Sequence, residues 1–340
     1  MDVVRAKRRG RVLEVTLDRP KVNAIDAATS VALGEAFREL QDDDDLSVGI
    51  ITAAGERFFS VGWDLKAAAA GEPPDADQGV GGFAGLTEHW ELKKPVVAAV
   101  NGMALGGGFE LALAADLIVA AEHAEFALTE AAIGLVPDAG GVIRLPRRLP
   151  RAVAMEMMLT GRRAGAAELE RWGLVFQTTT SAQLMDVARG LADRIAACAP
   201  LSLQAIKEID GVTQGASERD AFGIMREADL PVYRRLYDSD DAAEGIAGCA
   251  APSACPPGAH RSRATRAVGG EHHPAQGVGH GYDQTTIAVD PGAGHRRHER
   301  SGAGDGGRSG RGRGAGDGDQ SRSSACRGGR RGDRRRRHRA

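Results

Sequence analysis

The chain has 340 residues and a formal net charge of −2, which is enough sequence for one large domain or two smaller ones. The near-neutral total joins two unlike parts. Residues 246–340 carry 18 Arg against 8 acidic side chains, a balance of +10, which leaves −12 for residues 1–245. An acidic body without a basic stripe argues against nucleic-acid binding. No apolar run reaches the roughly 18 residues of a membrane span, which argues against an integral membrane protein.

The N-terminus and the cysteines indicate a cytoplasmic protein. The first residues, MDVVRAKRRGRVLEVTL, are basic but contain no apolar secretory core. We interpret them as a loop followed by the first strand, with a short organelle signal as the alternative. The cysteines are too scattered for a disulfide framework or a zinc site, so we expect a reducing compartment and no metal. They are Cys198, Cys249, Cys255 and Cys326.

Strand and helix patterns alternate through the first half of the chain. Asp26 or Thr29 is placed to cap a helix that runs to Leu40, and Pro and Gly predict a long loop over residues 71–85. In chain order, the pattern predicts a strand over 11–17, a helix to residue 40, a strand over 48–55, a loop and helix over 58–70, and strands over 95–100, 117–121 and 125–128.

From Arg151 onward the apolar residues follow the 3.6-residue spacing of helices. Strands followed by helices favour an α/β core with a helical C-terminal portion. We therefore predict an α/β core over residues 1–190, a helical portion for oligomerisation over 191–245, and a disordered Arg/Gly/Ala/Pro-rich tail over 246–340. The predicted helices of the second half cover residues 152–161, 166–173, 181–199 and 201–209.

A glycine turn follows one predicted strand and precedes an apolar helix. Glycines at 106–108 allow a tight turn and leave an unshielded N–H at the start of the helix, where the helix dipole favours negative charge. Residues Gly62, Trp63 and Asp64 form a second strand-to-helix loop that can supply a second N–H. Two such donors would make an oxyanion hole. The alternative is a plain strand-to-helix turn.

Two acidic residues accompany this turn in apolar surroundings. Glu110 lies in FELALAAD, and Glu130 lies between FALT and AAIG. A carboxylate that is buried without partners responds with a raised pKa, so either residue suits acid/base work. The alternative for each is a structural role, in which it pairs with a buried Arg or accepts a bond from a backbone amide. Their combination with the glycine turn favours acid/base chemistry on a carbonyl compound.

Four motifs resemble the enoyl-CoA hydratase/isomerase (crotonase) superfamily. They are FFSVGWDLK, KKPVVAAVNGMALGGGFELALAAD, TEAAIGLVPDAGG and LTGRRAGAAELERWGLV, and the similarity runs from about Val12 to Gly245. The resemblance implies a spiral of repeated ββα units with a helical C-terminal portion, assembled as a homotrimer or hexamer. Within the superfamily, GWDLKAAAAGEPPDAD, GGFAGLTE and PDAGGVIRLP most resemble the carnitinyl-CoA dehydratases.

The resemblance also implies roles for individual residues. The backbone N–H groups of Trp63 and Gly107 match the oxyanion hole for the thioester carbonyl, and Glu110 and Glu130 match the acid/base pair. One water held between the glutamates would hydrate a 2-enoyl-CoA, with no metal and no cofactor beyond the coenzyme A of the substrate. The residues that match coenzyme A- and substrate-binding segments are Lys21, Val22, Ala24, Gly62, Asp64, Leu65 and Lys66.

The acyl group implied by the closer resemblance is a cation, the quaternary ammonium of crotonobetainyl-CoA, which hydration would convert to carnitinyl-CoA. Aromatic faces bind such cations. Core packing is the alternative for Phe83 and Trp90, and we assign Asp138 to the ordering of its turn. The candidates for cation binding are the aromatic residues Trp63, Phe83 and Trp90, with Asp75 or Asp77 as the counter-charge.

Two other functions stay open. A general enoyl-CoA hydratase or isomerase of fatty acid oxidation is the alternative among enzymes. The segments RGRGAG and RGGRRGDRRRRHRA resemble RNA-binding sequences, so an RNA-tethered acyl-CoA-binding protein is the alternative of another class. We instead interpret the residues after about Gly245 as an out-of-frame translation, because they contain no Leu, Phe, Trp, Met or Lys. We therefore expect no nucleic-acid partner.

Overall fold

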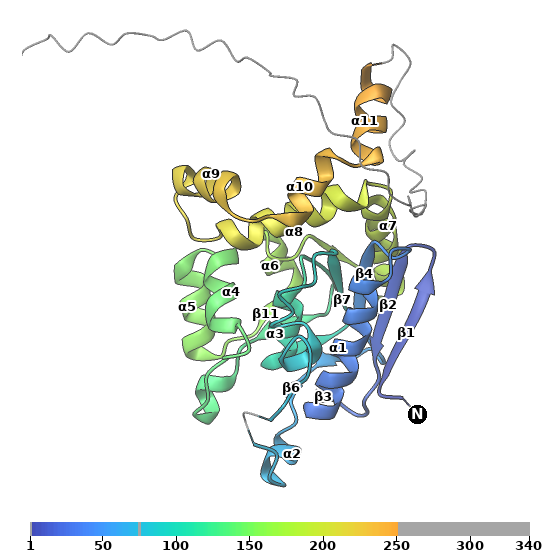
Figure 1. Cartoon of the computed structure of the whole chain (residues 1–340). Helices are drawn as coiled ribbons and strands as arrows, with labels where there is room; N and C mark the ends of the chain where they lie inside the picture. The colour runs from blue at the N-terminus through green and yellow to red at the C-terminus, as the bar shows by residue number, and fades with distance from the viewer. Residues whose placement is uncertain (1, 74–75, 251–340) are drawn as a thin grey trace, which may run out of the picture. The chain divides into compact units, whose positions relative to one another are not determined.

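The computed structural model describes residues 2–73 and 76–250 of the chain, which are coloured in Figure 1. All of the described residues belong to one unit of the chain, Met1–Val268. The predicted tail, its out-of-frame origin and its RNA-binding alternative fall, from residue 251 onward, outside the described residues. Residues 246–250, which the sequence prediction places in the tail, instead belong to helix α11 (Asp240–Ala250).

The main sheet is mostly parallel and is buried on both faces. Its strand order is β1-β2-β4-β7-β9-β12, with β1 antiparallel to β2 and the later neighbours parallel. Strands β4 and β7 are buried along their whole length, as expected for a parallel sheet that is covered on both sides. The strands are β1 (Val4–Arg9), β2 (Val12–Leu17), β4 (Val48–Ala53), β7 (Val96–Val100), β9 (Leu117–Ala121) and β12 (Gln177–Thr179).

Alternate side chains of this sheet enter two separate cores. Ile50 joins a cluster that includes Leu191 of helix α7 (Leu184–Ala196), so α7 covers one face of the sheet. Ile51 points the other way, because successive side chains of a strand face opposite sides. It enters the larger core, which also contains Phe109 from the helix that carries Glu110. The main sheet therefore supports the site through this larger core.

Helix α1 (Ala27–Asp42) begins where the sequence predicts. Asp26 is its N-cap, since the Asp26 side chain accepts a 2.9 Å hydrogen bond from the Thr29 backbone N–H. The helix ends two residues beyond the predicted Leu40 and packs beside β1 and β2 (Figure 1). Phe37 on its buried face belongs to the larger core.

Two smaller sheets carry the loops of the site. One has the order β11-β10-β8-β5, and the other pairs β3 with β6 in parallel. Helix α3 (Gly107–Ala114) starts directly after β8, so the predicted glycine turn and its helix are confirmed. The strands are β3 (Ala24–Ile25), β5 (Phe58–Ser60), β6 (Gly62–Trp63), β8 (Met103–Leu105), β10 (Glu125–Ala127) and β11 (Ala164–Gly165).

Several elements and one boundary differ from the prediction, among them strands β11 and β12, which form in the half of the chain where only helices are predicted. Strand β1 forms where we expect a loop, because its backbone pairs with β2 at six positions although its side chains are mostly exposed. Helix α4 forms despite Pro146, which lies near its end, and the fully buried Leu145 anchors it. The predicted division between residues 190 and 191 falls inside α7. The remaining helices are α2 (Leu65–Ala69), η1 (Phe83–Gly85), η2 (Glu130–Ile133), α4 (Gly141–Arg148), α5 (Arg151–Thr160), α6 (Ala166–Arg171), η3 (Ser181–Gln183), α8 (Pro200–Thr213), α9 (Glu218–Glu227) and α10 (Pro231–Tyr237).

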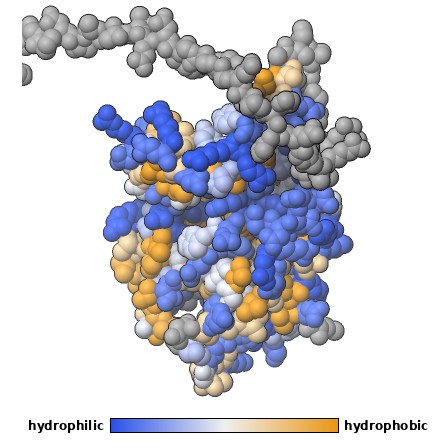
Figure 2. Space-filling model, in the orientation of Figure 1, coloured by the Kyte–Doolittle hydropathy of each residue, from blue (hydrophilic) through white to orange (hydrophobic). Residues whose placement is uncertain are grey.

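Exposed apolar side chains gather over η2, α4 and α5. Figure 2 shows hydrophobic residues at the surface in the region where Figure 1 places α4 and α5. We call this surface the apolar strip. Large apolar residues at the surface of a folded chain mark an interaction face when they are contiguous. The strip consists of Ile133, Leu135, Val136, Val142, Ile143 and Leu159, each at least 40% exposed.

Candidate active site

The two predicted strand-to-helix loops lie against each other. Gly62 in β6 has φ +81°, and a Cβ atom placed on it would overlap the Gly107 nitrogen and lie 2.9 Å from Gly107 Cα. A side chain at position 62 is therefore excluded by the backbone of α3 as well as by the conformation. This close approach brings the backbone of Trp63 beside the first turn of α3.

Both predicted oxyanion donors are backbone groups with accessible geometry. The Asp64 N–H donates to the Ile25 carbonyl at 2.8 Å. Since alternate N–H groups of a strand point to opposite edges, the Trp63 N–H points away from β3. Gly107 is the first residue of α3, and the N–H groups of a first helical turn have no acceptor within the helix. The arrangement suits the predicted oxyanion hole, whose assignment to Trp63 and Gly107 stays a prediction.

Glu110 lies in the first turn of α3 and is almost completely buried. Only 3% of its surface is exposed, and its Oε1 accepts a 2.7 Å hydrogen bond from the Gly141 N–H. Burial raises the pKa of Glu110 to about 8, and the negative charges of Glu130 and Asp138 act in the same direction, whereas the Gly141 bond opposes them. Glu110 therefore holds a proton at neutral pH.

Glu130 begins the short helix η2 and packs against the glycine turn. A Cβ atom on Gly106 would lie 2.9 Å from Glu130 Oε1, and Gly106 has φ +52°, so this position requires glycine on both grounds. Glu130 Oε2 is buried and has no hydrogen-bond partner within the described ranges. Burial raises the pKa of Glu130, and Asp138 raises it further. The unpaired oxygen is available to a water or to the substrate.

The two glutamates line one cavity of about 370 Å³. Trp63 and Phe83 supply aromatic surface to the same cavity, and Gly107 lies in its wall. Among the described residues that line it there are four acidic side chains and no Lys, Arg or His. The cavity thus combines the predicted acid/base pair, the predicted donors and a negative, aromatic lining. The four acidic side chains are Glu88, Glu110, Glu130 and Asp138.

The cation-binding candidates divide between the cavity and the surface. Trp90 is 70% exposed, so its core-packing interpretation is wrong; it lies outside the cavity, and its role in cation binding stays a prediction. Asp77 is exposed and accepts a bond from the Gly79 N–H at 2.9 Å, and Asp75 lies outside the described residues. Asp138, which we assign to its turn on sequence grounds, lines the cavity instead.

The predicted coenzyme A-binding residues surround the β3–β6 sheet. Ala24 pairs with Gly62, and the Val22 carbonyl accepts a 3.2 Å bond from the Val61 N–H. Of these residues only Leu65 lines the cavity. Asp64 caps α2 and is bound by an Arg side chain, so its carboxylate is already engaged. Lys21, Leu65 and Lys66 are exposed. The role of all seven residues in binding coenzyme A stays a prediction.

Sequence reasoning missed the residues that hold the site in place. No buried Arg pairs with Glu110 among the described residues: the half-buried Arg144 donates to the carbonyls of Thr87 and Ala139. The true partner is the Gly141 N–H at the start of α4. The glycine pair of PDAGG carries the same signal as the earlier glycine turn and could have predicted this helix start. Two further residues next to the Trp63 segment, Arg19 and Glu72, carry no local signal in the sequence: Arg19 binds Asp64, and Glu72 binds the Trp63 indole.

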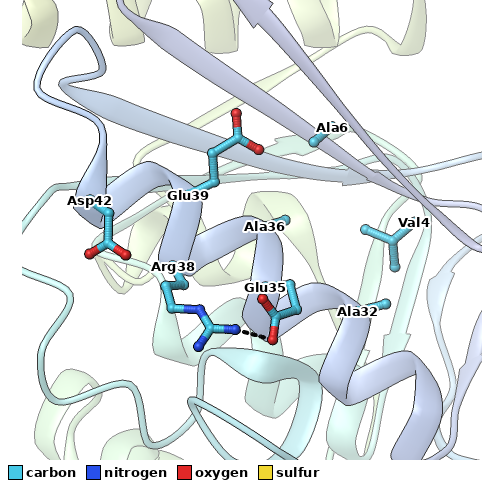
Figure 3. A pocket seen from close by; sticks show the side chains of 8 residues that line it. All are labelled: Val4, Ala6, Ala32, Glu35, Ala36, Arg38, Glu39 and Asp42. Atoms are coloured by element: carbon cyan, nitrogen blue, oxygen red, sulfur yellow. Dashed lines mark ion pairs between the residues drawn. The ribbon is translucent and has the colours of Figure 1, made fainter.

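A second hollow lies on the surface between β1 and α1 (Figure 3). None of the predicted site residues lines it, and its charged side chains are exposed or paired, as in the ion pair between Glu35 and Arg38. This hollow therefore plays no part in the predicted site. The hollow is lined by Val4, Ala6, Ala32, Glu35, Ala36, Arg38, Glu39 and Asp42.

The described residues contain no candidate metal site and no candidate membrane span. No group of three or more His, Cys, Asp or Glu side chains in these residues is arranged to hold a metal ion. None of the helices in the same ranges is long and apolar enough to cross a membrane.

Comparison with known proteins identifies the family. The model of the enoyl-CoA hydratase/isomerase family matches residues 7–250. The carnitinyl-CoA dehydratase of Proteus mirabilis (strain HI4320) is 58% identical over 237 residues, which cover 70% of this chain and 91% of the relative. The carnitinyl-CoA dehydratase of Escherichia coli (strain K12) is 58% identical over 238 residues, with 70% and 91% covered.

Solved structures give the same result. An enoyl-CoA hydratase from Mycobacterium tuberculosis H37Rv superposes with a TM-score of 0.67 at 40% identity, covering 73% of this chain and 95% of that one. A carnitinyl-CoA dehydratase from Mycobacterium avium 104 gives 0.60 at 43% identity, with 72% and 96% covered. The chain belongs to the enoyl-CoA hydratase/isomerase family. The predicted superfamily, the α/β fold and the class of enzyme, a hydro-lyase of the enoyl-CoA hydratase type, are confirmed, and an acyl-CoA substrate follows from the family.

Proposed function

We propose that this enzyme catalyses the reversible hydration of a 2-enoyl-CoA thioester whose acyl group is cationic, converting crotonobetainyl-CoA to carnitinyl-CoA. The observation that carries the proposal is the single cavity in which Glu110 and Glu130, both with raised pKa values, lie beside the backbone of Trp63 and Gly107. The carnitinyl-CoA dehydratases at 58% identity support the acyl group.

The mechanism follows from the order of these groups. The thioester oxygen accepts hydrogen bonds from the Trp63 and Gly107 N–H groups, which stabilise the negative charge that develops on it and make the β carbon electrophilic. A water held between Glu110 and Glu130 attacks the β carbon. The ionised member of the pair takes one proton from the water, and the protonated member gives one proton to the α carbon. One water is added, and the pair, which shares a single proton, ends with the same charge.

The lining of the cavity favours a positive acyl group. Its formal charge is negative, and Trp63 and Phe83 offer aromatic faces of the kind that bind quaternary ammonium groups. Glu88 and Asp138 add carboxylates that the hydration itself does not use. A neutral, unbranched enoyl chain would gain nothing from this charge. The proposal therefore prefers a cationic substrate over the general enoyl-CoA hydratase.

The test compares three substrates that differ in the acyl end: crotonobetainyl-CoA, its isostere with a tert-butyl group in place of trimethylammonium, and crotonyl-CoA. We expect kcat/KM for the cation to exceed that for the tert-butyl isostere by about tenfold or more, since a desolvated cation beside aromatic rings gains ~1–2 kcal/mol. Loss of the enoyl thioester absorbance measures turnover. Equal or faster turnover of crotonyl-CoA contradicts the cationic acyl group, and no hydration of any of the three contradicts the reaction.

A pair of variants assigns the preference to the cavity. Glu88→Gln removes one lining charge and should lower the preference for the cation over its isostere by about threefold to tenfold. Glu91→Gln removes a charge three residues away that is exposed and outside the cavity, and it should leave the preference unchanged. A similar effect of both variants would attribute the preference to long-range charge instead of the cavity.

Assembly, cofactor and location form the finer part of the proposal. A homotrimer or hexamer is supported by the apolar strip, of which three residues, Ile133, Leu135 and Val136, also line the cavity. No cofactor besides the coenzyme A of the substrate is required by the mechanism, and we place the enzyme in the cytoplasm.

A further inference from the structure

The guanidinium of Arg19 joins the segment that follows Trp63 to the segment between β3 and α1. Arg19 Nη1 donates to Asp64 Oδ2 at 2.7 Å and to the Ala24 carbonyl at 3.0 Å. Arg19 Nη2 donates to Asp26 Oδ2 at 2.6 Å. The Arg19 side chain is 25% exposed, and the side chains of Asp26 and Asp64 are 20% and 14% exposed. The planar fork of an arginine can hold two carboxylates in a fixed relative position, which a lysine cannot.

The two carboxylates are themselves helix caps. Asp26 Oδ1 accepts the Thr29 N–H of α1 at 2.9 Å, and Asp64 Oδ1 accepts the Lys66 N–H of α2 at 2.9 Å. Burial alone would raise the pKa of Asp64, but the bonds from Arg19 and from the α2 backbone outweigh it and lower the pKa. Arg19 therefore couples the start of α1 to the start of α2. Asp64 directly follows Trp63, so the coupling reaches the strand that carries the predicted oxyanion donor.

The side chain of Trp63 is tied to the same helix. Its indole Nε1–H donates to Glu72 Oε1 at 3.3 Å, and Glu72 Oε2 accepts the Ala27 N–H in the first turn of α1, also at 3.3 Å. Strand β6 also pairs with β3, which lies between Arg19 and Asp26 in the chain. The start of α1 thus fixes Trp63 from two sides, through Asp64 and through Glu72.

We propose that Arg19 is a positioning residue for the thioester-binding site: by locking the caps of α1 and α2 together, it holds the Trp63 N–H in register with the Gly107 N–H. Arg19 acts through Asp64 and does not line the cavity. The inference rests on the proposed hydration and on the two backbone donors. Its effect should appear in the polarisation of the bound carbonyl and in kcat more than in KM.

The test uses Arg19→Met in the full-length chain. The probe is 4-dimethylaminocinnamoyl-CoA, a conjugated enoyl thioester whose absorption moves to longer wavelength when its carbonyl is polarised. We expect the absorption shift on binding to be smaller in R19M than in the wild type. We also expect kcat to fall about tenfold to a hundredfold, which does not exceed the fall that removal of a whole oxyanion donor causes. Arg19→Lys keeps the positive charge but loses the planar guanidinium that binds two carboxylates. Relative to R19M, it should restore only part of the absorption shift and part of kcat.

The matched control is Arg162→Met. Arg162 also joins two carboxylates, Glu156 at 2.8 Å and Glu168 at 3.0 Å, and is 36% exposed, but it lies outside the cavity. R162M should keep the wild-type absorption shift and kcat even if its melting temperature falls. Equal loss of the shift in R162M and R19M would reduce the role of Arg19 to general stability and overturn the inference.

A second variant decides the question if R19M does not fold. Asp64→Asn keeps an acceptor for the α2 cap but weakens the bond to Arg19, and we expect a partial loss of the same absorption shift. A folded D64N or R19M with the wild-type shift and wild-type kcat overturns the inference. Absence of any shift in the wild-type protein contradicts the oxyanion hole of the proposed function itself, so the two failures are distinguishable.

Discussion

Glu110 has 3% of its surface exposed and, within the described part of the chain, one hydrogen-bond donor, the Gly141 N–H. Its pKa rises from 4.5 to about 8 because burial disfavours the charged form. Between these two pH values the folded protein binds a proton that the unfolded chain has lost, so the stability contributed by this residue falls as the pH rises. The penalty is absent below pH 4.5, grows up to about pH 8 and is constant above it.

Glu110→Gln removes this titration together with the acid/base group. The variant should therefore gain stability over the wild type, and the gain should increase from pH 5 to pH 8 and then level off, at no more than about 5 kcal/mol. We expect kcat to fall about a hundredfold to ten-thousandfold in the same variant. Thermal unfolding at several pH values and steady-state assays measure the two effects.

The control for this prediction is another buried glutamate. Glu208 is 5% exposed, but its carboxylate accepts N–H bonds from both Val232 and Tyr233. Glu208→Gln should bring no gain in stability, because it weakens two charge-assisted bonds. A difference in melting temperature between E110Q and the wild type that is the same at pH 5 and pH 8 would contradict the linkage argument.

Individual residues were predictable where the signal is local. Glu110 and Glu130 lie in apolar runs, and the neighbouring glycines predict a turn. A single stretch of sequence is therefore enough to predict the two glutamates as site residues. Arg19 and Asp64 are 45 positions apart, and Glu88 enters the cavity from a segment that is separated from both glutamates. Such contacts depend on how the elements pack, which the spacing of residues in the chain does not encode.

At the scale of elements, the contact between β6 and α3 is the tightest constraint on the site. Gly62→Ala places a methyl group against the Gly107 backbone and also strains a residue at φ +81°. The two backbones must separate, and the predicted donors move with them. We expect kcat to fall about a hundredfold or more, as for the loss of an oxyanion donor, and the protein to lose about 1–3 kcal/mol of stability.

Gly10→Ala is the control for Gly62→Ala, because it introduces the backbone strain of a positive φ without a steric clash. Gly10 has φ +59°, but a Cβ atom there would have no neighbour within 4 Å. This variant should lose about 1 kcal/mol of stability and retain full activity. The comparison is made by thermal unfolding and steady-state kinetics on both variants. An active G62A with the stability of G10A would show that the loops do not need to touch.

Elements were predictable where burial is uniform. The strand over residues 48–55 is apolar along its length and appears as β4 (Val48–Ala53). Strand β1 (Val4–Arg9) escaped prediction because it lies at the sheet edge, with side chains that are exposed or half-buried. Helix α4 (Gly141–Arg148) escaped because Pro146 reads as a helix breaker, although a proline near the end of a helix removes only one bond.

At the scale of the whole molecule, the apolar strip predicts self-association. Ile143→Glu combined with Leu159→Glu places two charges on α4 and α5, where the side chains are 51% and 69% exposed. We expect the double variant to dissociate to monomers and to lose activity, because the strip continues into the cavity wall at Ile133. Analytical ultracentrifugation measures the mass, and circular dichroism verifies that the fold is retained.

Val31→Glu is the control for the strip. Val31 on α1 is 38% exposed and lies outside the strip, so this variant should keep the mass and the activity of the wild type. A wild-type protein that sediments as a monomer would remove the assembly from the proposal. The hydration chemistry would still be tested independently by the substrate comparison.

The use of main-chain donors at Trp63 and Gly107 has a consequence for how this enzyme can adapt. Position 63 contributes its backbone N–H to the proposed oxyanion hole and its indole to the wall of the cavity. Of these two groups, only the indole changes when the residue is substituted. A substitution there changes the wall that faces the acyl chain and removes the indole's bond to Glu72, but it keeps the N–H itself in the backbone. Gly62, in contrast, tolerates no such substitution. Two adjacent positions therefore carry different constraints: position 62 must be glycine to keep the backbone contact with α3, whereas position 63 shapes the acyl pocket.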